Sequence, residues 1–196
     1  MSRRQTRGKP RFFCCSVRCL SGNYPEVPGS DTNLRAVDPR VRIGHVHLKV
    51  ADLERSLAFY CGVLGFELMQ RLGTQAAFIS AGAYHHHIGL NTWESLNGSP
   101  APPSSTGLFH FAILYPDRAT LADALRRLLA AKVPLDGASD HGVSEALYLT
   151  DPDQNGLELY RDRPEHEWPR NPDGSIAMFT DPLDLDALLR DASNDR

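Results

Sequence analysis

Alternating apolar and polar residues recur at two places in the chain, residues 44–52 and 109–117. Each stretch contains a histidine, an alternating run typical of a strand, and an aspartate seven residues after the histidine. His45 and His110 are therefore 65 residues apart, as are Asp52 and Asp117. Apolar residues at helical spacing follow each aspartate, so both aspartates stand where helix N-caps are expected.

Short β-like runs follow each predicted helix. They cover 66–71, 75–80 and 86–93 in the first unit, and 144–150 and 156–161 in the second, with a poorer run at 133–135. Each unit therefore reads β-α-β-β-β, and a half of this size cannot bury its sheet alone. The pattern predicts an α+β fold of two paired βαβββ modules, over 42–96 and 107–168, joined by a Gly/Pro/Ser-rich linker at 97–106.

The C-terminal extension, residues 169–196, is rich in proline and aspartate and ends in a short helical pattern. Asp181 is a candidate N-cap with Pro182 at the first helical position. Leu185, Leu188 and Leu189 then share one face. We expect a packing element or a lid.

The N-terminal region differs in charge from the rest of the chain. Residues 1–41 carry a net charge of +5, whereas residues 42–196 carry −8. This arginine-rich start is interpreted as a disordered tail, with a transit peptide as the alternative. It holds Cys14, Cys15 and Cys19, and no second cysteine pair completes a zinc site. The body, with Cys61 alone, is expected to be reduced and cytoplasmic.

Length and composition limit the classes of function. The chain has 196 residues and a net charge of −3, which argues against a protein that binds nucleic acid by neutralising phosphates. Its uncharged stretches are too short to span a bilayer, so no membrane partner is expected. A homo-oligomer stays open, because two modules in one chain can already close a cup.

Strand alternation separates a core face from a second, cup-like face in each module. The apolar residues expected in the core are Val46, Leu48, Val50, Phe111, Ile113, Leu147, Leu149, Leu157 and Leu159. His45, His110, Tyr148 and Glu158 lie on the opposite face. A lone histidine at a strand end is usually only polar surface. Pairing of the modules would bring both histidines together with a glutamate, and two histidines with a carboxylate is the ligand set of non-haem Fe(II) oxygenases.

Residues 42–168 resemble the vicinal oxygen chelate superfamily, which is built from paired βαβββ modules. The resemblance rests on the opening 43–46 and the helix 52–60. The stretch 140–158 is similar to that of the extradiol (catechol 2,3-) dioxygenases within this superfamily: a histidine, a hydrophobic-Tyr pair, Asp-Pro, then a glutamate. Gln154, where the family pattern usually has Gly or Pro, and Ser139 depart from that pattern.

The resemblance implies a role for each of six residues. His45, His110 and Glu158 would be the metal ligands, and His141 and Tyr148 would hydrogen-bond to substrate and oxygen. The acid–base histidine would be His86, with His87 as the alternative. Strict alternation places His86 on the side of Ile88, away from the cup, unless a bulge or a late strand start intervenes.

The implied activity is Fe(II)-dependent ring cleavage of a catechol-type diol by O2, although Mn(II) accepts the same ligands. Three relatives are alternatives. A glyoxalase uses four ligands, and its second glutamate would fall where this chain has Gly89. Thiol transferases share the ligand triad but usually have one unit per chain. A ligand-sequestering protein of the bleomycin-resistance type needs no such triad and is not an enzyme.

Overall fold

The computed structural model describes residues 36–192, so the expectations for the tail before residue 36, including its three cysteines, lie outside the described residues. The chain divides into two units, residues 1–41 and 42–196. The described helices and strands all lie in the second unit. Among these helices, none combines the length and apolar character that a membrane crossing needs.

The first module has one sheet with strand order β1-β4-β3-β2. Its elements are β1 (Val46–Lys49), α1 (Leu53–Leu57) with a π-helical continuation (Ala58–Val63), β2 (Glu67–Leu72), β3 (Ala76–Ser80) and β4 (Ile88–Asn91). Strand β1 pairs in parallel with β4, and the remaining pairs are antiparallel.

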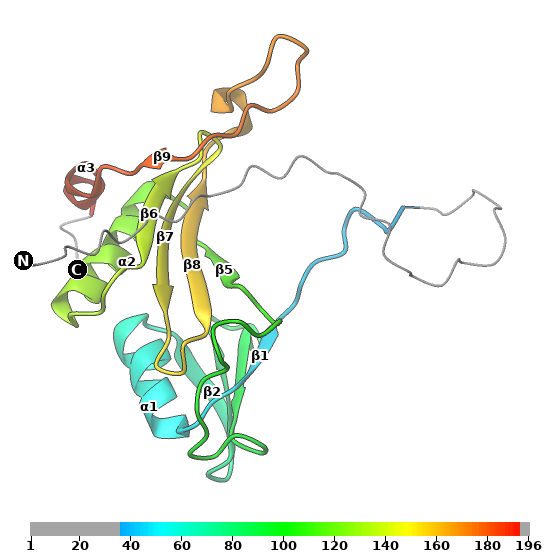
Figure 1. The fold of residues 1–196 in the computed structure, drawn as a ribbon, viewed down its shortest axis with the longest axis vertical. Coiled ribbons are helices and arrows are strands. Elements are labelled where there is room, and N and C mark those ends of the chain that lie inside the picture. The colour runs from blue at the N-terminus through cyan, green and yellow to red at the C-terminus, as the bar shows by residue number, and fades with distance from the viewer. Residues whose placement is uncertain (1–35, 193–196) are drawn as a thin grey trace, which may run out of the picture. The chain divides into compact units, whose positions relative to one another are not determined.

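The second module repeats this plan and adds an edge strand, giving the order β5-β8-β7-β6-β9. Its elements are β5 (Phe111–Leu114), α2 (Arg118–Ala130), β6 (Gly137–Asp140), β7 (Ser144–Thr150), β8 (Gly156–Asp162), a 3-10 turn (Glu165–Glu167), β9 (Asp181–Pro182) and α3 (Leu185–Arg190). Figure 1 shows α2 along this sheet and α3 beside α2. The predicted pair of βαβββ modules is confirmed.

Both helices begin at the predicted aspartates. Asp52 accepts hydrogen bonds from the backbone of Glu54 and Arg55, at 3.0 and 3.1 Å. Asp117 forms a capping box with Thr120, in which each side chain bonds the other's backbone N–H. These bonds satisfy amide groups that the first helical turn would otherwise leave unpaired.

Two expected boundaries were wrong. No strand forms at 133–135; Val133 N donates to Leu128 O at 2.9 Å, in the turn that caps the C-terminus of α2. The C-terminal helix begins later than expected, with Asp184 as its N-cap. Asp181 and Pro182 instead pair with Asp140 and Ser139 as strand β9. Tertiary pairing with a sheet edge therefore takes precedence over the local capping signal.

The core forms between each sheet and its helices, and the alternation that predicted its members holds. Buried members include Leu48, Val50, Phe111, Leu147, Leu149, Leu157 and Leu159, with Val46 and Ile113 partly buried beside them. The helices contribute residues such as Leu53, Tyr60, Leu121, Leu125 and Leu128.

The β7–β8 loop fastens the second module to the first. Asp153 accepts hydrogen bonds from Ala51 N (3.0 Å), Arg55 Nη2 (2.6 Å) and Ser56 Oγ (3.3 Å). Asp151, 2% exposed, accepts from the Tyr60 hydroxyl at 2.9 Å. We call these contacts the module clasp. They satisfy polar groups on both sides and tie the β7–β8 loop to the helix of the first module.

Asp153→Ala should lower the free energy of unfolding by about 2 kcal/mol, because three donors of the first module lose a buried anionic acceptor. Urea denaturation of the full chain measures the change. The exposed Asp136→Ala is the matched control and should unfold like the wild type. Equal stability of both variants would show that the clasp does not hold the modules.

Candidate metal and catalytic site

The two predicted histidine ligands occupy equivalent places. His45 directly precedes β1, and His110 directly precedes β5. The register of the strand pairs extends this equivalence to the last strand of each module. In the second module Ala112 pairs with Glu158. The residue equivalent to Ala112 in the first module is His47, 65 positions earlier, and it pairs with Gly89. Gly89 therefore stands where a second carboxylate would be.

The space beside Gly89 is already occupied. A Cβ at this position would lie 3.0 Å from the His47 ring, closer than carbon atoms normally approach. The imidazole of His47 also packs against Phe78 and Trp93, at 6.0 and 5.6 Å between ring centroids. In the first module the His47 ring therefore fills the space that the fourth ligand of a glyoxalase would need.

Four predicted site residues form a continuous chain of polar contacts in the second module. His110 Nε2 lies 3.1 Å from Glu158 Oε2. The Tyr148 hydroxyl donates to Glu158 Oε1 at 3.1 Å and lies 2.8 Å from His141 Nε2. Strand pairing explains the order, since Tyr148 and Glu158 are direct partners in the β7–β8 ladder. The glutamate side chain is 15% exposed.

In the first module, His86 lies beside His45. Their ring centroids are 4.5 Å apart, and His86 also contacts Phe78 at 5.0 Å. Strand β4 begins only at Ile88, so His86 is outside the strand and alternation does not govern its direction. A late strand start therefore resolves the conflict. His87 lines the pocket together with His45, and its Nδ1 lies 2.9 Å from Ser80 Oγ.

Two of the predicted catalytic residues, His86 and Tyr148, have shifted pKa values. Burial lowers the pKa of His86, and the neighbouring histidines, first among them His45, lower it further. This keeps the imidazole neutral and able to accept a proton at neutral pH. Burial, the charge of Glu158 and the hydrogen bond to it raise the pKa of Tyr148, which therefore keeps its proton.

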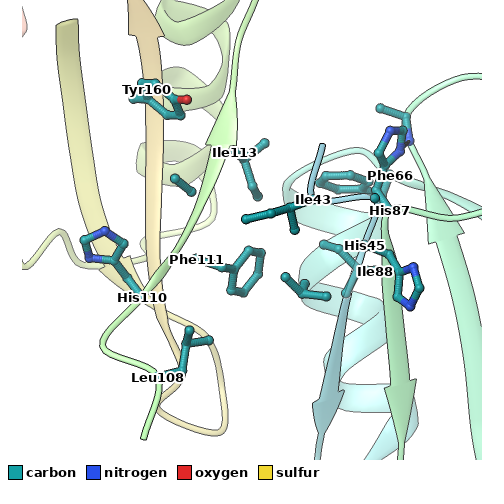
Figure 2. Close-up of a pocket in the computed structure, with 14 residues that line it drawn as sticks. Ile43, His45, Phe66, His87, Ile88, Leu108, His110, Phe111, Ile113 and Tyr160 are labelled. Carbon is teal, nitrogen blue, oxygen red and sulfur yellow. Dashed lines mark hydrogen bonds between the residues drawn. The ribbon is translucent and has the colours of Figure 1, made fainter. Parts of the chain in front are cut away.

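A pocket of about 550 Å³ lies between the two modules, and both His45 and His110 line it. In Figure 2, the apolar side chains of Ile43, Phe111 and Ile113 lie between His110 on one side and His45 and His87 on the other. Within residues 36–192, no three His, Cys, Asp or Glu side chains are grouped so that they could hold a metal ion. The structure pairs two of the predicted ligands and leaves His45 apart from them.

The donor set fits a divalent metal in its chemistry and in the spacing of this pair. Two donor atoms bound at right angles to one ion, each at roughly 2.1 Å, lie about 3 Å apart. The 3.1 Å between His110 Nε2 and Glu158 Oε2 matches that separation. Imidazole and carboxylate donors together suit Fe(II). The roles of the three ligands remain predictions.

Sequence reasoning missed two neighbours of the site. Phe78 packs on both His47 and His86, and alternation could have found it, because Ala77 and Ile79 on either side are buried. The backbone carbonyl of Phe179 lies 3.0 Å from His141 Nδ1. A backbone contact across 38 residues leaves no signal in a sequence pattern.

Comparisons with known proteins indicate the family of the chain. A family model described as Glyoxalase/Bleomycin resistance protein/Dioxygenase superfamily matches residues 42–159. The chain is 41% identical, over 164 residues, to a protein of Bacillus subtilis (strain 168) named Catechol-2,3-dioxygenase; the match covers 83% of this chain and 56% of the relative. It is 30% identical over 125 residues to Biphenyl-2,3-diol 1,2-dioxygenase 2 of Rhodococcus globerulus, with 62% and 63% covered.

The chain thus spans between 56% and 63% of the length of these two curated relatives. Among solved structures, a glyoxalase/dioxygenase from Nostoc punctiforme is similar with a TM-score of 0.54 at 20% identity. That match covers 66% of this chain and 98% of the other, and it supports the fold alone.

The raised pKa of Tyr148 makes stability depend on pH in the alkaline range. The folded protein holds this proton more tightly than the unfolded chain, whose phenols titrate near about pH 10. The stabilisation that this proton gives the folded state is therefore complete below about pH 10 and is lost as the pH rises further. Urea unfolding from about pH 8 to 11 should show a shallower alkaline loss in Tyr148→Phe than in the wild type. The exposed Tyr84→Phe is the control, and equal slopes for wild type and Tyr148→Phe would contradict the shift.

Proposed function

Because the chain belongs to the glyoxalase/bleomycin resistance protein/dioxygenase superfamily, we propose that it is an Fe(II)-dependent extradiol dioxygenase. It would open the ring of a catechol-type diol with O2. The observation that carries this proposal is the chain of contacts from His110 through Glu158 and Tyr148 to His141. The names of the two dioxygenase relatives support the same reaction class.

His45, His110 and Glu158 would hold the metal, which could also be Mn(II). When bound, the ion would supply Lewis-acid chemistry that lowers the pKa of the catechol hydroxyls and would supply the electrons needed to activate O2. His45 must join the other two ligands, so the proposal requires the modules to close over the pocket between them. Its wall of Ile43, Phe111 and Ile113 would exclude water from the aromatic ring.

The remaining polar residues would handle protons. Nδ1 of His86 lies 2.7 Å from His85 Nδ1. With Nδ1 of His86 as the donor in that bond, Nε2 of the neutral ring would accept a catechol proton. Tyr148 keeps its phenolic proton and can donate it to an oxygen of the substrate or of bound O2. His141, bonded to that hydroxyl, would orient it. Acid–base residues at both ends of the site suit a reaction that first removes and later returns a proton.

Two alternative functions within the superfamily differ in how well they fit the geometry. Gly89 stands at the register position of the missing fourth ligand, with His47 packed against it, which disfavours a four-ligand lactoylglutathione lyase. The separation of His45 from the His110–Glu158 pair favours, as second candidate, a ligand-sequestering protein with no turnover.

The proposal is tested by loading the full chain with Fe(II) without oxygen, then adding catechol and air. A yellow ring-opened semialdehyde is expected. Glu158→Ala should lose both bound iron and colour, because a carboxylate donor and the partner of His110 disappear together. Glu67→Ala, at an exposed position on β2, is the control and should retain both. Bound iron with full turnover in Glu158→Ala would refute the ligand set, and bound ligand without colour would favour the sequestering protein.

Tyr148→Phe separates proton handling from metal binding. The phenyl ring keeps the shape of the site but loses the hydroxyl between His141 and Glu158. Iron content should stay at the wild-type level while kcat falls by about 10- to 100-fold. Metal analysis and steady-state kinetics on the same preparation measure both quantities. An unchanged kcat would remove Tyr148 from the mechanism.

A further inference from the structure

The pocket between the modules has a strongly apolar lining. Its apolar side chains come from both modules, with Ile43, Phe66 and Ile88 from the first and Leu108, Phe111 and Ile113 from the second (Figure 2). Among the described residues that line it, none is Lys, Arg, Asp or Glu. A pocket of about 550 Å³ takes a ligand larger than a bare catechol ring, so a substituent on that ring would contact these walls.

The polar side chains of the lining offer no lasting positive charge within the described residues. They are three imidazoles and one phenol, His45, His87, His110 and Tyr160. The two predicted ligands, His45 and His110, must be neutral to bind a metal. Burial, followed by the negative charges of Asp162 and Glu158, raises the pKa of Tyr160, which therefore keeps its proton. An anionic substituent would face this lining without a permanently charged partner.

The charges around the pocket are mainly negative. Glu158 Oε2 lies 3.1 Å from His110 Nε2, which lines the pocket, and residues 42–196 carry a net charge of −8. A field of this sign repels an anionic ligand before contact. A bound divalent ion would not reverse this, because Glu158 and the ionised diol together balance its charge.

The two kinds of substituent therefore differ in free energy of binding. A carboxylate against apolar walls loses hydration and gains no opposite charge. An alkyl or aryl group gains free energy there by burying apolar surface. Specificity is a difference between two such affinities, and both terms act in the same direction here.

We propose that this pocket selects diols with an uncharged, apolar substituent, an alkyl or aryl group, and rejects diols that carry a carboxylate. That the ligand is a diol rests on the proposed function. The preference for an uncharged substituent does not, and it holds equally for a sequestering protein. Ile43 and Leu108, which line the pocket from different modules, are the positions at which the preference is open to change.

The test compares two probes of matched shape, a catechol with an isobutyl group and a catechol with a carboxymethyl group at the same ring carbon. Calorimetry on the full chain, with metal and oxygen excluded, measures both dissociation constants. The wild type should bind the isobutyl compound at least about tenfold more tightly, because the carboxylate is left unpaired.

Two variants place a cation in the lining. Ile43 and Leu108 are 91% and 60% exposed, so the fold should tolerate Ile43→Arg and Leu108→Arg. Each should reduce the preference for the isobutyl compound by about fivefold, because the guanidinium pairs with the carboxylate. Leu129→Arg is the matched control: Leu129 is 51% exposed on α2 and outside the lining, so the same added charge should leave the ratio unchanged.

Equal affinity of the wild type for both probes, or no binding of the isobutyl compound, would overturn the proposal. So would an unchanged ratio in both lining variants, or an equal change in Leu129→Arg. With Fe(II) and air, the same order is expected in kcat/KM. Selective binding without cleavage would uphold the preference and refute the dioxygenase function, whereas cleavage of both probes with equal kcat/KM would overturn the preference and leave that function standing.

Discussion

The module clasp is the constraint on which the site depends. Each βαβββ half buries one face of its sheet, but the proposed chemistry would need residues from both halves. Asp151 and Asp153 supply the connection, because their carboxylates satisfy donors at the start of α1 and the hydroxyl of the buried Tyr60. Unpaired, these groups would carry a desolvation cost, so the bonds hold the β7–β8 loop against the start of α1.

The clasp also explains one departure from the family pattern. Gln154 lies between the clasp and β8 with a φ of +67°, a left-handed conformation that glycine adopts most easily. The loop tolerates glutamine there because its N–H bonds Asp151 O at 3.0 Å. Gln154 therefore affects only the strain of this turn, and Tyr148 still pairs with Glu158 in the β7–β8 ladder.

The two modules contribute different parts of the proposed site, and polar contacts connect only the part in the second module. In the second module, His110, Glu158, Tyr148 and His141 are already connected, and the Phe179 carbonyl oxygen lies 3.0 Å from Nδ1 of His141. In the first module, His45 and His86 pack against each other and against Phe78. His45 and His110, one from each module, line the same pocket, so module closure would govern assembly of the proposed metal centre.

The sequence by itself determined the repeated βαβββ plan, the aspartate caps of both helices and the core face of each strand. These features follow from periodicity and local hydrogen bonding, which act between near neighbours. Tertiary structure decided what long-range contacts control. Asp181 pairs with β6 and is therefore a strand residue. Strand β4 starts late, so His86 lies beside His45. The segment after β8 places the Phe179 carbonyl oxygen next to His141. No local pattern encodes such contacts, because each depends on where a distant segment of the chain comes to lie.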